Sequence, residues 1–193
     1  MIRMATERDI PAILDIYGPY VRDTAISFEY TVPTPESFTQ RFRDITTQFP
    51  WLVWEEDGEI LGYAYGSAPF ERAAFGWCCE ASIYLRPDAR GRGIGKALYA
   101  VLEELMKLQG YVKVYVLVTS ANQPSVDFHL ACGYTYAACL PGCGFKLGAW
   151  HDLFWLEKPL KSVDMPTNFP IPVNAIVEID RKFHKILEDL SLS

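Results

Sequence analysis

The sequence IYLRPDA, residues 83–89, runs directly into RGRGIG, residues 90–95, and then into KALYAVLEELMKLQ, residues 96–109. The first segment is apolar and β-rich, and the second is rich in glycine and arginine. From residue 94 to residue 108, apolar side chains recur with the spacing of a helix that buries one face. Gly110 follows, at a C′ position that favours glycine. The stretch therefore predicts a strand, a tight basic loop and a long helix.

The loop at residues 90–95 is suited to binding phosphate. A loop that opens a helix leaves backbone N–H groups unpaired, and the helix macrodipole adds partial positive charge at the same end. The loop is not a Walker A motif, which would end in Gly-Lys-Ser/Thr. It is not the Rossmann GxGxxG motif either, because its glycines fall at 91, 93 and 95. A glycine turn that merely caps an ordinary helix is the simpler alternative.

The composition indicates a globular chain of one domain that binds a small ligand. The 193 residues are 50% hydrophobic and 14% aromatic, enough to bury a sizeable core. The formal net charge of -6 argues against a nucleic-acid-binding protein that relies on a general basic field. Arg86, Arg90, Arg92 and Lys96 nevertheless form a local basic cluster, which suits a small anionic cofactor. A merely solvated surface is the alternative for each of them.

The N-terminus and the cysteines favour a cytoplasmic protein. The N-terminal MIRMA has no signal-peptide apolar region, and no apolar run approaches transmembrane length. The five cysteines, at positions 78, 79, 132, 139 and 143, contain no CxxC pair. Neither a disulfide framework nor a zinc site is indicated, and we expect no metal. We expect reduced, mostly buried thiols.

The other segments predict an α/β chain with a mixed sheet. Helices are expected from an N-cap at Asp9 through Val21, from an N-cap at Thr34 to about Phe49, from Asn122 to Cys132, and over residues 181–192. Strands are expected at residues 2–4, 51–55, 60–68, 75–85 and 111–118, and after Gly133 as far as residues 153–156, with a hairpin turn at Asp57-Gly58. The apolar connection 24–30 either carries function or packs Phe28 and Tyr30 on the core.

Several motifs in one order resemble a known family. The loop Arg90-x-x-Gly93-x-Gly95 is similar to the acyl-CoA pyrophosphate loop of the GNAT acetyltransferase superfamily. The segments EASIYL (80–85), NxxSxxxHxxxGY (122–134) and GFKxGxWHD (144–152) sharpen the match. Together they resemble the phosphinothricin N-acetyltransferase family, which includes methionine sulfoximine/sulfone acetyltransferases. The resemblance implies a GNAT acyl-CoA N-acyltransferase fold over residues 1–160, with a mostly antiparallel sheet flanked by helices. Residues 161–193 would be a proline-rich tail that packs on or extends this domain.

The resemblance also implies how acetyl-CoA is held. The backbone of Ile83 and Leu85 would pair with the pantetheine amides as an added strand does, and residues 90–95 would hold the pyrophosphate. Asn122 would bond the pantetheine arm, although capping of the short helix is an equal alternative. The expected cofactor-binding residues are Ile83, Tyr84, Leu85, Arg90, Gly91, Arg92, Gly93, Ile94, Gly95, Asn122 and Ser125.

Two residues are candidates for proton transfer. An amine arrives mostly as ammonium and must lose a proton before it attacks, which suits Glu80 as a general base. Without the resemblance, Glu80 would read as an exposed strand residue. His129 matches the family's histidine and could serve as acid or base, since imidazole titrates near neutrality. A lone helix histidine is otherwise structural or solvated, and the division of work between the two residues stays open.

The acceptor pocket is expected to involve Phe28, Arg72, Tyr84, Lys146 and Trp150. Arg72 would pair a substrate carboxylate, with a solvent-facing arginine as the simpler alternative. In the stretch from Arg72 to Cys79, this chain has Gly76 and two cysteines where the family commonly has a polar Tyr-Asp-Trp-Thr pattern. This departure bears on the identity of the substrate more than on the reaction.

The resulting hypothesis is an acetyl-CoA-dependent N-acetyltransferase for a small amino-acid-like amine, of the phosphinothricin or methionine sulfoximine type. Alternatives are a CoA-binding sensor without turnover, an acetyltransferase for another small amine, and a protein acetyltransferase. The bulky Phe28 and Trp150 favour a closed small-molecule pocket over a peptide groove. The family implies a homodimer, and we expect no nucleic-acid or membrane partner.

Overall fold

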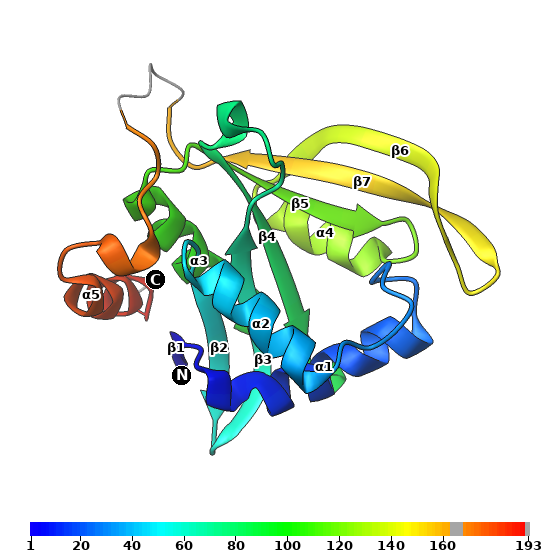
Figure 1. The fold of residues 1–193 in the computed structure, drawn as a ribbon, viewed down its shortest axis with the longest axis horizontal. Helices are drawn as coiled ribbons and strands as arrows, with labels where there is room; N and C mark the ends of the chain where they lie inside the picture. The colour runs from blue at the N-terminus through cyan, green and yellow to red at the C-terminus, as the bar shows by residue number, and fades with distance from the viewer. Residues whose placement is uncertain (163–167, 192–193) are drawn as a thin grey trace.

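The computed structural model describes residues 1–162 and 168–191 and is built on one seven-stranded sheet (Figure 1). The strands are β1 (Ile2–Met4), β2 (Trp51–Glu56), β3 (Glu59–Ser67), β4 (Cys78–Leu85), β5 (Lys113–Thr119), β6 (Thr135–Lys146) and β7 (Ala149–Pro159). Their order across the sheet is β1-β2-β3-β4-β5-β7-β6, and β4 with β5 is the one parallel pair. The mixed, mostly antiparallel sheet is therefore as predicted.

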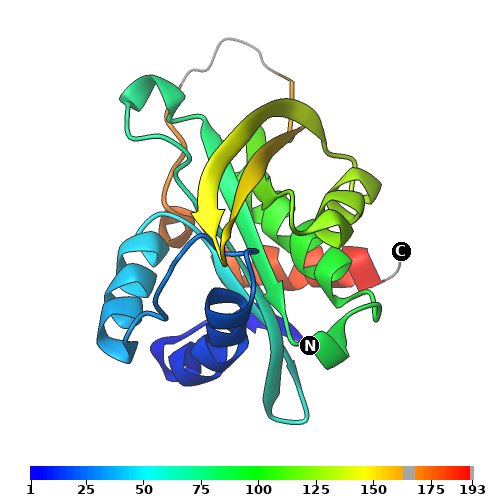
Figure 2. The ribbon, with the colours of Figure 1, turned by 90° about the vertical axis from the view of Figure 1, so that its right-hand side faces the viewer.

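Helices cover both faces of the sheet (Figure 2). They are α1 (Ile10–Asp23), α2 (Pro35–Thr46), α3 (Ile94–Gln109), α4 (Gln123–Ala131) and α5 (Ile179–Ser191). On one face, α1 and α2 enclose a core with Trp51 and Tyr63. On the other, α3, α4 and α5 enclose a larger core that includes Leu98 and Phe183. The two cores hold the sheet between them, so that both its faces are buried where the central strands lie.

The helix α3 has the bounds that the apolar period predicts. Gly93 precedes it with φ +81° and Gly110 follows it with φ +111°, both in the left-handed region where a side chain would be strained. Gly110 N–H closes the helix by donating to the Lys107 carbonyl at 3.1 Å. The helix is thus delimited by glycines at both ends, and the first of them shapes the basic loop.

Asp9 is the N-cap residue of α1, as predicted, but its side chain does not cap the helix, because Arg3 and the backbone N–H of Thr6 occupy its carboxylate. Two predicted boundaries are wrong. Helix α2 ends at Thr46 rather than Phe49, since the residue before Pro50 disfavours helical backbone. Strand β4 starts at Cys78, because Ala73–Phe75 form a 3-10 turn instead of extending the strand.

The expectation of mostly buried thiols is also wrong. All five cysteines are free, but only Cys79 is buried, while Cys139 and Cys143 are exposed on the edge strand β6. The edge strand has no partner on one side to bury them. Among the described residues, no helix is long and apolar enough to cross a membrane.

The C-terminal segment lies against the body of the chain. Ile171 N–H donates to the Gln109 carbonyl at 2.9 Å, and Val173 N–H donates to the Gln48 carbonyl at 3.0 Å. Helix α5 places Phe183 in the larger core. The predicted terminal helix is present as α5, although Leu192 lies outside the described residues, as does Pro166 of the proline-rich stretch.

Candidate active site

A fork between β4 and β5 is the main feature of the site. The two strands pair only from Cys78 with Lys113 to Glu80 with Tyr115, and beyond this point they separate. Arg86 N–H donates to the Leu61 carbonyl of β3 at 2.9 Å. Because hydrogen bonding alternates along an antiparallel strand, the backbone groups of Ile83 and Leu85 point away from β3 and into the fork. The fork thus offers an open strand edge to a ligand.

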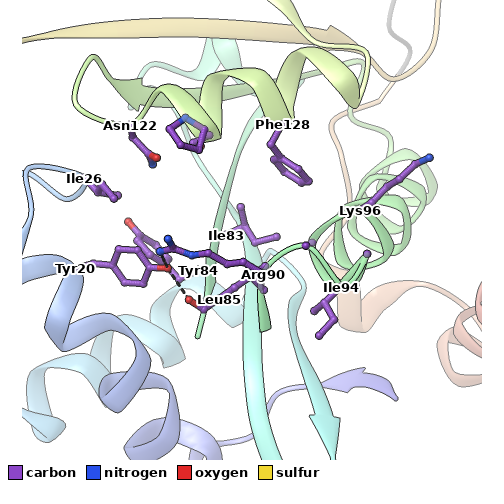
Figure 3. A pocket seen from close by; sticks show the side chains of 15 residues that line it. Tyr20, Ile26, Ile83, Tyr84, Leu85, Arg90, Ile94, Lys96, Asn122 and Phe128 are labelled. Carbon is purple, nitrogen blue, oxygen red and sulfur yellow. Dashed lines mark hydrogen bonds between the residues drawn. The ribbon is translucent and has the colours of Figure 1, made fainter. Parts of the chain in front are cut away.

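A groove of about 410 Å³ runs from this fork to the glycine-rich loop (Figure 3). Gly91 and Gly93 have φ of +73° and +81°, and a Cβ atom at either would meet no atom within 4 Å. The open space lies over the start of α3, where unpaired N–H groups and the helix dipole favour an anion. The groove is lined by Tyr20, Ile26, Ile83, Tyr84, Leu85, Arg90, Gly91, Gly93, Ile94, Gly95, Lys96, Asn122, Pro124, Ser125 and Phe128.

The structure separates the four basic residues into two kinds. Arg86 pairs with Glu59 and Asp88, each at 2.7 Å, and Arg92 pairs with Glu56 at 2.7 Å. These two guanidinium groups lie outside the groove. Arg90 and Lys96 line it, and neither forms an ion pair within residues 1–162 and 168–191. The charge available to a ligand therefore comes from Arg90 and Lys96, while the Arg92 side chain is directed elsewhere.

Asn122 reaches the groove from the start of α4 (Figure 3). Ser125, in the first turn of α4, lines the groove as well. The Asn122 side chain makes no capping hydrogen bond to the helix. The alternative role as a cap is therefore not realised, and within the described part of the chain the amide is available to contact a ligand. Ser125 bonds inward, with Oγ 3.3 Å from Nδ1 of His129.

A small polar pocket of about 50 Å³ lies deeper in the fork and shares Ile83, Asn122 and Ser125 with the groove. Its polar side chains are those of Ser82, Tyr84, Tyr99, Thr119, Asn122, Ser125 and His129. The Thr119 hydroxyl is buried and has no hydrogen-bond partner in the part of the chain that the structure describes. A buried hydroxyl without a partner is costly, so this pocket is built to receive a polar group.

His129 forms one wall of this pocket and is 3% exposed. Its Nδ1 lies 2.6 Å from the Ser125 carbonyl, which can only accept, so Nδ1 carries the proton. Nε2 lies 2.9 Å from the Tyr99 hydroxyl and accepts from it. Burial lowers the pKa of His129 to about 4. The ring is therefore neutral near pH 7, with both nitrogens engaged.

Glu80 lies at the apex of the fork, at the last paired position of β4 and β5. Burial raises the pKa of its carboxyl group to about 7, and no ion pair to it occurs among the described residues. Side chains alternate along a strand, so Glu80 shares its face with Tyr84, which packs against α1. His129 comes from the opposite face. The two candidates therefore approach the fork from opposite sides of the sheet.

The connection between α1 and α2 covers the Glu80 face and is held there by the hairpin β6–β7. Lys146 is 3% exposed, and its Nζ donates to the Ser27 carbonyl at 2.5 Å. The Phe28 ring lies against Gly144, where a Cβ atom would come within 2.3 Å of it. Burial lowers the pKa of Lys146. Phe28 and Lys146 are thus brought together from segments far apart in the sequence.

The other acceptor candidates are more dispersed. Tyr84 lines the groove and packs on Tyr17 with ring centroids 4.9 Å apart. Arg72 is exposed on the β3–β4 connection, and Trp150 is 68% exposed on β7. Tyr84 lines both the groove and the polar pocket, whereas Phe28, Arg72, Lys146 and Trp150 line neither. Trp150 therefore lies outside both of these pockets.

The departure at Gly76 has a structural explanation. A Cβ atom at Gly76 would lie 3.0 Å from the Phe169 ring, and this ring stacks on Trp77 with centroids 4.3 Å apart. Trp77 Nε1 also donates to the Asn168 carbonyl at 2.9 Å. The C-terminal segment therefore occupies the space that a side chain at position 76 would need.

Sequence reasoning missed three residues of the site: Tyr20, Tyr99 and Thr119. Tyr20 donates from its hydroxyl to the Leu85 carbonyl at 2.5 Å, across 65 residues of sequence. Tyr99 lies on the buried face of α3, where an aromatic residue reads as core. Thr119 ends a β-branched strand and reads as a strand residue. All three residues carry a hydroxyl group at a position where a buried, apolar side chain is expected. A buried hydroxyl needs a hydrogen-bond partner, and this was the only signal in the sequence that could have indicated them.

Comparison with known proteins identifies the family. The acetyltransferase (GNAT) family model matches residues 15–134. The chain is 32% identical over 179 residues to a phosphinothricin N-acetyltransferase of Streptomyces viridochromogenes, covering 92% of this chain and 95% of that protein. It is 35% identical to an L-methionine sulfoximine/L-methionine sulfone acetyltransferase of Pseudomonas aeruginosa, covering 81% of this chain and 92% of the relative.

A solved structure supports the same assignment. A phosphinothricin acetyltransferase of the GNAT superfamily from Sinorhizobium meliloti, in complex with AcCoA, superposes with a TM-score of 0.84 at 33% identity, covering 90% of this chain and 96% of that one. The TM-score shows that the two chains share one fold, and the family model covers the segment from α1 to the glycine-rich loop and α4. The chain belongs to the GNAT family of acetyltransferases and is an N-acetyltransferase.

Proposed function

We propose that this protein transfers the acetyl group of acetyl-CoA to the amine of a small amino-acid-like acceptor of the phosphinothricin or methionine sulfoximine type. The observation that carries the proposal is Glu80, a carboxyl group with a pKa raised to about 7 at the apex of the fork. A base with a pKa near the working pH is suited to taking a proton from an ammonium group. The acceptor class is that named for the relatives from Streptomyces and Pseudomonas.

The groove fits acetyl-CoA in its chemistry. The open edge at Ile83 and Leu85 can pair with two amides of the pantetheine arm, as an added strand does. The loop of Arg90 to Gly95 can hold a pyrophosphate through backbone N–H groups, with Lys96 beside it. Asn122 faces the same groove with a free amide. Acetyl-CoA supplies an activated acyl group there, and these residues would hold and orient it.

The chemical step then requires a neutral amine next to the thioester carbonyl. Glu80 would take one proton from the acceptor ammonium, directly or through water, so that the neutral nitrogen can form the new C–N bond as the C–S bond breaks. The nitrogen loses its second proton as the amide forms, and the departing CoA thiolate takes up that proton, so that the products are the amide and the CoA thiol. The carboxylate makes no ion pair in the described part of the chain that would hold its pKa low. Its protonation near pH 7 is therefore reversible within the working range, which a general base needs.

His129 has a different role in this proposal. A neutral ring whose only proton is bonded to the Ser125 carbonyl has no proton at Nε2 to give to a leaving thiolate. Its Nε2 instead accepts from Tyr99 and orients that hydroxyl at the wall of the polar pocket. We therefore assign proton abstraction to Glu80, and to His129 the positioning of the pocket's polar groups.

On the acceptor side, we propose that Lys146 and Phe28 help to define the pocket. Lys146 is a buried cation above the sheet face that carries Glu80, held by the Ser27 carbonyl. It can attract the carboxylate or phosphinate of an amino-acid-like substrate. Arg72 and Trp150 are exposed, so they could contact only a part of the substrate that extends out of the pocket.

The test is release of CoA thiol from acetyl-CoA with a panel of amines: phosphinothricin, methionine sulfoximine, methionine sulfone, ordinary amino acids, polyamines and a lysine peptide. Selective turnover of the first three, lost in Glu80→Gln, is the expected result. Selective turnover of another amine would replace the acceptor class but leave the reaction. Binding of acetyl-CoA with no turnover of any amine would contradict the proposed reaction and favour a sensor.

We also propose that the enzyme is a cytoplasmic homodimer with one domain at residues 1–160 that the tail at 161–193 extends. Strand β6 is a long, exposed edge strand with exposed apolar side chains at Tyr136 and Leu140. Such an edge invites pairing with another strand. The free thiols suit a reducing compartment. Light scattering during size-exclusion chromatography should give twice the chain mass, and a monomer at micromolar concentration would contradict the dimer.

A further inference from the structure

We propose that Tyr20 is a positioning residue for the cofactor, because its hydroxyl holds the guanidinium group of Arg90 inside the groove. This inference rests on the proposed binding of acetyl-CoA to that groove. It concerns a residue of α1, which lies 70 positions before Arg90 in the sequence and far from the glycine-rich loop along the chain.

The contact between the two side chains is specific. Nη2 of Arg90 lies 2.7 Å from the Tyr20 hydroxyl oxygen, and the guanidinium carbon lies 5.5 Å from the centroid of the Tyr20 ring. Figure 3 shows the Arg90 side chain extending from the start of the loop across the groove toward Tyr20. The arginine therefore interacts with both the oxygen and the face of the phenol ring.

The direction of the bonds makes Tyr20 an acceptor for Arg90. The single hydroxyl hydrogen of Tyr20 is donated to the Leu85 carbonyl at 2.5 Å, so its oxygen can only accept from another donor. Tyr20 itself is 8% exposed, and its ring packs edge-on against Tyr84 with centroids 5.2 Å apart. A buried, fixed hydroxyl thus links the loop residue to the open edge of β4.

Charge explains why this contact matters for an anionic ligand. The neighbouring Arg86 and Arg92 are each paired with acidic side chains outside the groove. Arg90 is held by a neutral phenol instead, so its position is fixed while its charge is not compensated. Its remaining N–H groups are available to the phosphates or polar atoms of acetyl-CoA. Without Tyr20, the long side chain would sample solvent, and its ordering would oppose binding.

The test compares Tyr20→Phe, Arg90→Met and the double variant by calorimetric titration with acetyl-CoA. The phenylalanine keeps the ring and its packing but removes the acceptor oxygen. We expect Tyr20→Phe to weaken acetyl-CoA binding about tenfold, Arg90→Met to weaken it at least as much, and the double variant to match Arg90→Met. In turnover assays, the KM for acetyl-CoA should rise with Tyr20→Phe, while the KM for the acceptor stays unchanged.

Tyr17→Phe is the matched control. Tyr17 lies on the same helix and packs on the same Tyr84, but its hydroxyl bonds to Ser27 at 2.8 Å. Acetyl-CoA affinity should not change in this variant. Two results would overturn this inference but leave the proposed function standing. One is an unchanged affinity for acetyl-CoA in Tyr20→Phe. The other is a loss of affinity from Tyr20→Phe that is the same in the wild-type and Arg90→Met backgrounds. Failure of the wild-type protein to bind acetyl-CoA would instead overturn the proposed function, and this inference with it.

Discussion

The hydroxyl of Tyr99 donates to Nε2 of His129 over 2.9 Å, within a helix pair that buries both residues. The other ring nitrogen is bonded to the Ser125 carbonyl. The imidazole is therefore locked in one neutral tautomer, and burial keeps its pKa at about 4. In the proposed mechanism, this arrangement leaves proton transfer near neutral pH to Glu80, and the role of acid or base that the resemblance offered for His129 stays a prediction.

The buried histidine makes stability depend on pH. Its pKa is lower in the folded chain than the ordinary value of 6.5, so the unfolded chain binds the extra proton first. The stability it contributes is complete above pH 6.5 and falls as pH drops toward 4. We expect a loss of about 2 kcal/mol between pH 7 and pH 5 from this residue. Because the raised pKa of Glu80 changes stability in the opposite direction over this range, the comparison is between variants: from pH 7 to pH 5, the change in the free energy of unfolding measured with urea should be about 2 kcal/mol more favourable in His129→Phe than in the wild type.

Other groups also titrate in this range, so the comparison needs a control. His184→Phe is matched, because His184 lies exposed on α5 and bonds only to a carbonyl of its own helix. This variant should keep the wild-type pH dependence. An unchanged difference between pH 7 and pH 5 in His129→Phe would show that His129 accepts its proton in the folded chain.

Glu80 makes the activity depend on pH. With its pKa raised to about 7, the carboxyl group is mostly protonated below that pH and is a base only above it. The value of kcat/KM for the acceptor should rise with pH through about 7. Glu80→Gln should lower kcat by about 10²- to 10⁴-fold and abolish this rise of kcat/KM with pH. Its stability effect has the reverse sign, since a raised carboxyl pKa costs folded stability as pH rises from 4.5 to 7.

A surface glutamate provides the comparison for Glu80→Gln. Glu104 on α3 pairs with Lys107 and lies away from the fork, so Glu104→Gln should keep the wild-type pH profile. If kcat/KM still rises with pH through about 7 in Glu80→Gln, the titrating group is the acceptor amine or another residue. Glu80 would then not be the base.

Gly93 is a further test of the loop. Its φ of +81° lies in the left-handed region, and no neighbouring atom would clash with an added Cβ. Gly93→Ala should therefore cost about 1 kcal/mol of stability from backbone strain alone, and it should raise the KM for acetyl-CoA by disturbing the N–H groups over α3. Gly142→Ala is matched, since Gly142 on β6 has φ +54° and equally open space. It should lower the melting temperature similarly but leave that KM unchanged, and equal effects on KM would contradict a loop that binds phosphate.

Lys146 tests the acceptor side. Lys146→Met should raise the KM for the acceptor more than tenfold and leave the KM for acetyl-CoA unchanged, because the lysine is buried on the Glu80 face. Removing its ammonium group also leaves the Ser27 carbonyl without that donor, at a cost of about 1–3 kcal/mol. Lys107→Met, on the exposed side of α3, should change neither constant. A rise in both KM values would indicate a general loss of structure.

The parts of this molecule that the sequence predicts well are local. Helix α3 follows from an apolar period bounded by Gly93 and Gly110, and the hairpin turn follows from Asp57-Gly58, which have φ of +51° and +82°. These signals lie within a few residues of the structure they specify. The glycine-rich loop is likewise readable, because its chemistry is that of its own backbone.

The parts that could not be predicted depend on contacts between distant segments. The partner of Arg90 is Tyr20, and nothing near either residue marks the pair. The same holds for the burial that lowers the pKa of His129 and raises that of Glu80, since both result from packing of several elements. The prediction of mostly buried cysteines was wrong for the same reason. Cys139 and Cys143 lie on an edge strand, and which strand lies at the edge depends on the strand order of the whole sheet.

The final prediction concerns the C-terminal segment. Phe169 stacks on Trp77 at the start of β4, three residues before Glu80, and fills the space beside Gly76. Phe169→Ala should cost about 1 kcal/mol of stability through the lost ring pair and speed amide hydrogen exchange over residues 72–78. Val177→Ala, at a position 76% exposed, is the control and should change neither property. If exchange at residues 72–78 stays at the wild-type rate in Phe169→Ala, the segment does not order the approach to Glu80, and the glycine at position 76 must have another cause.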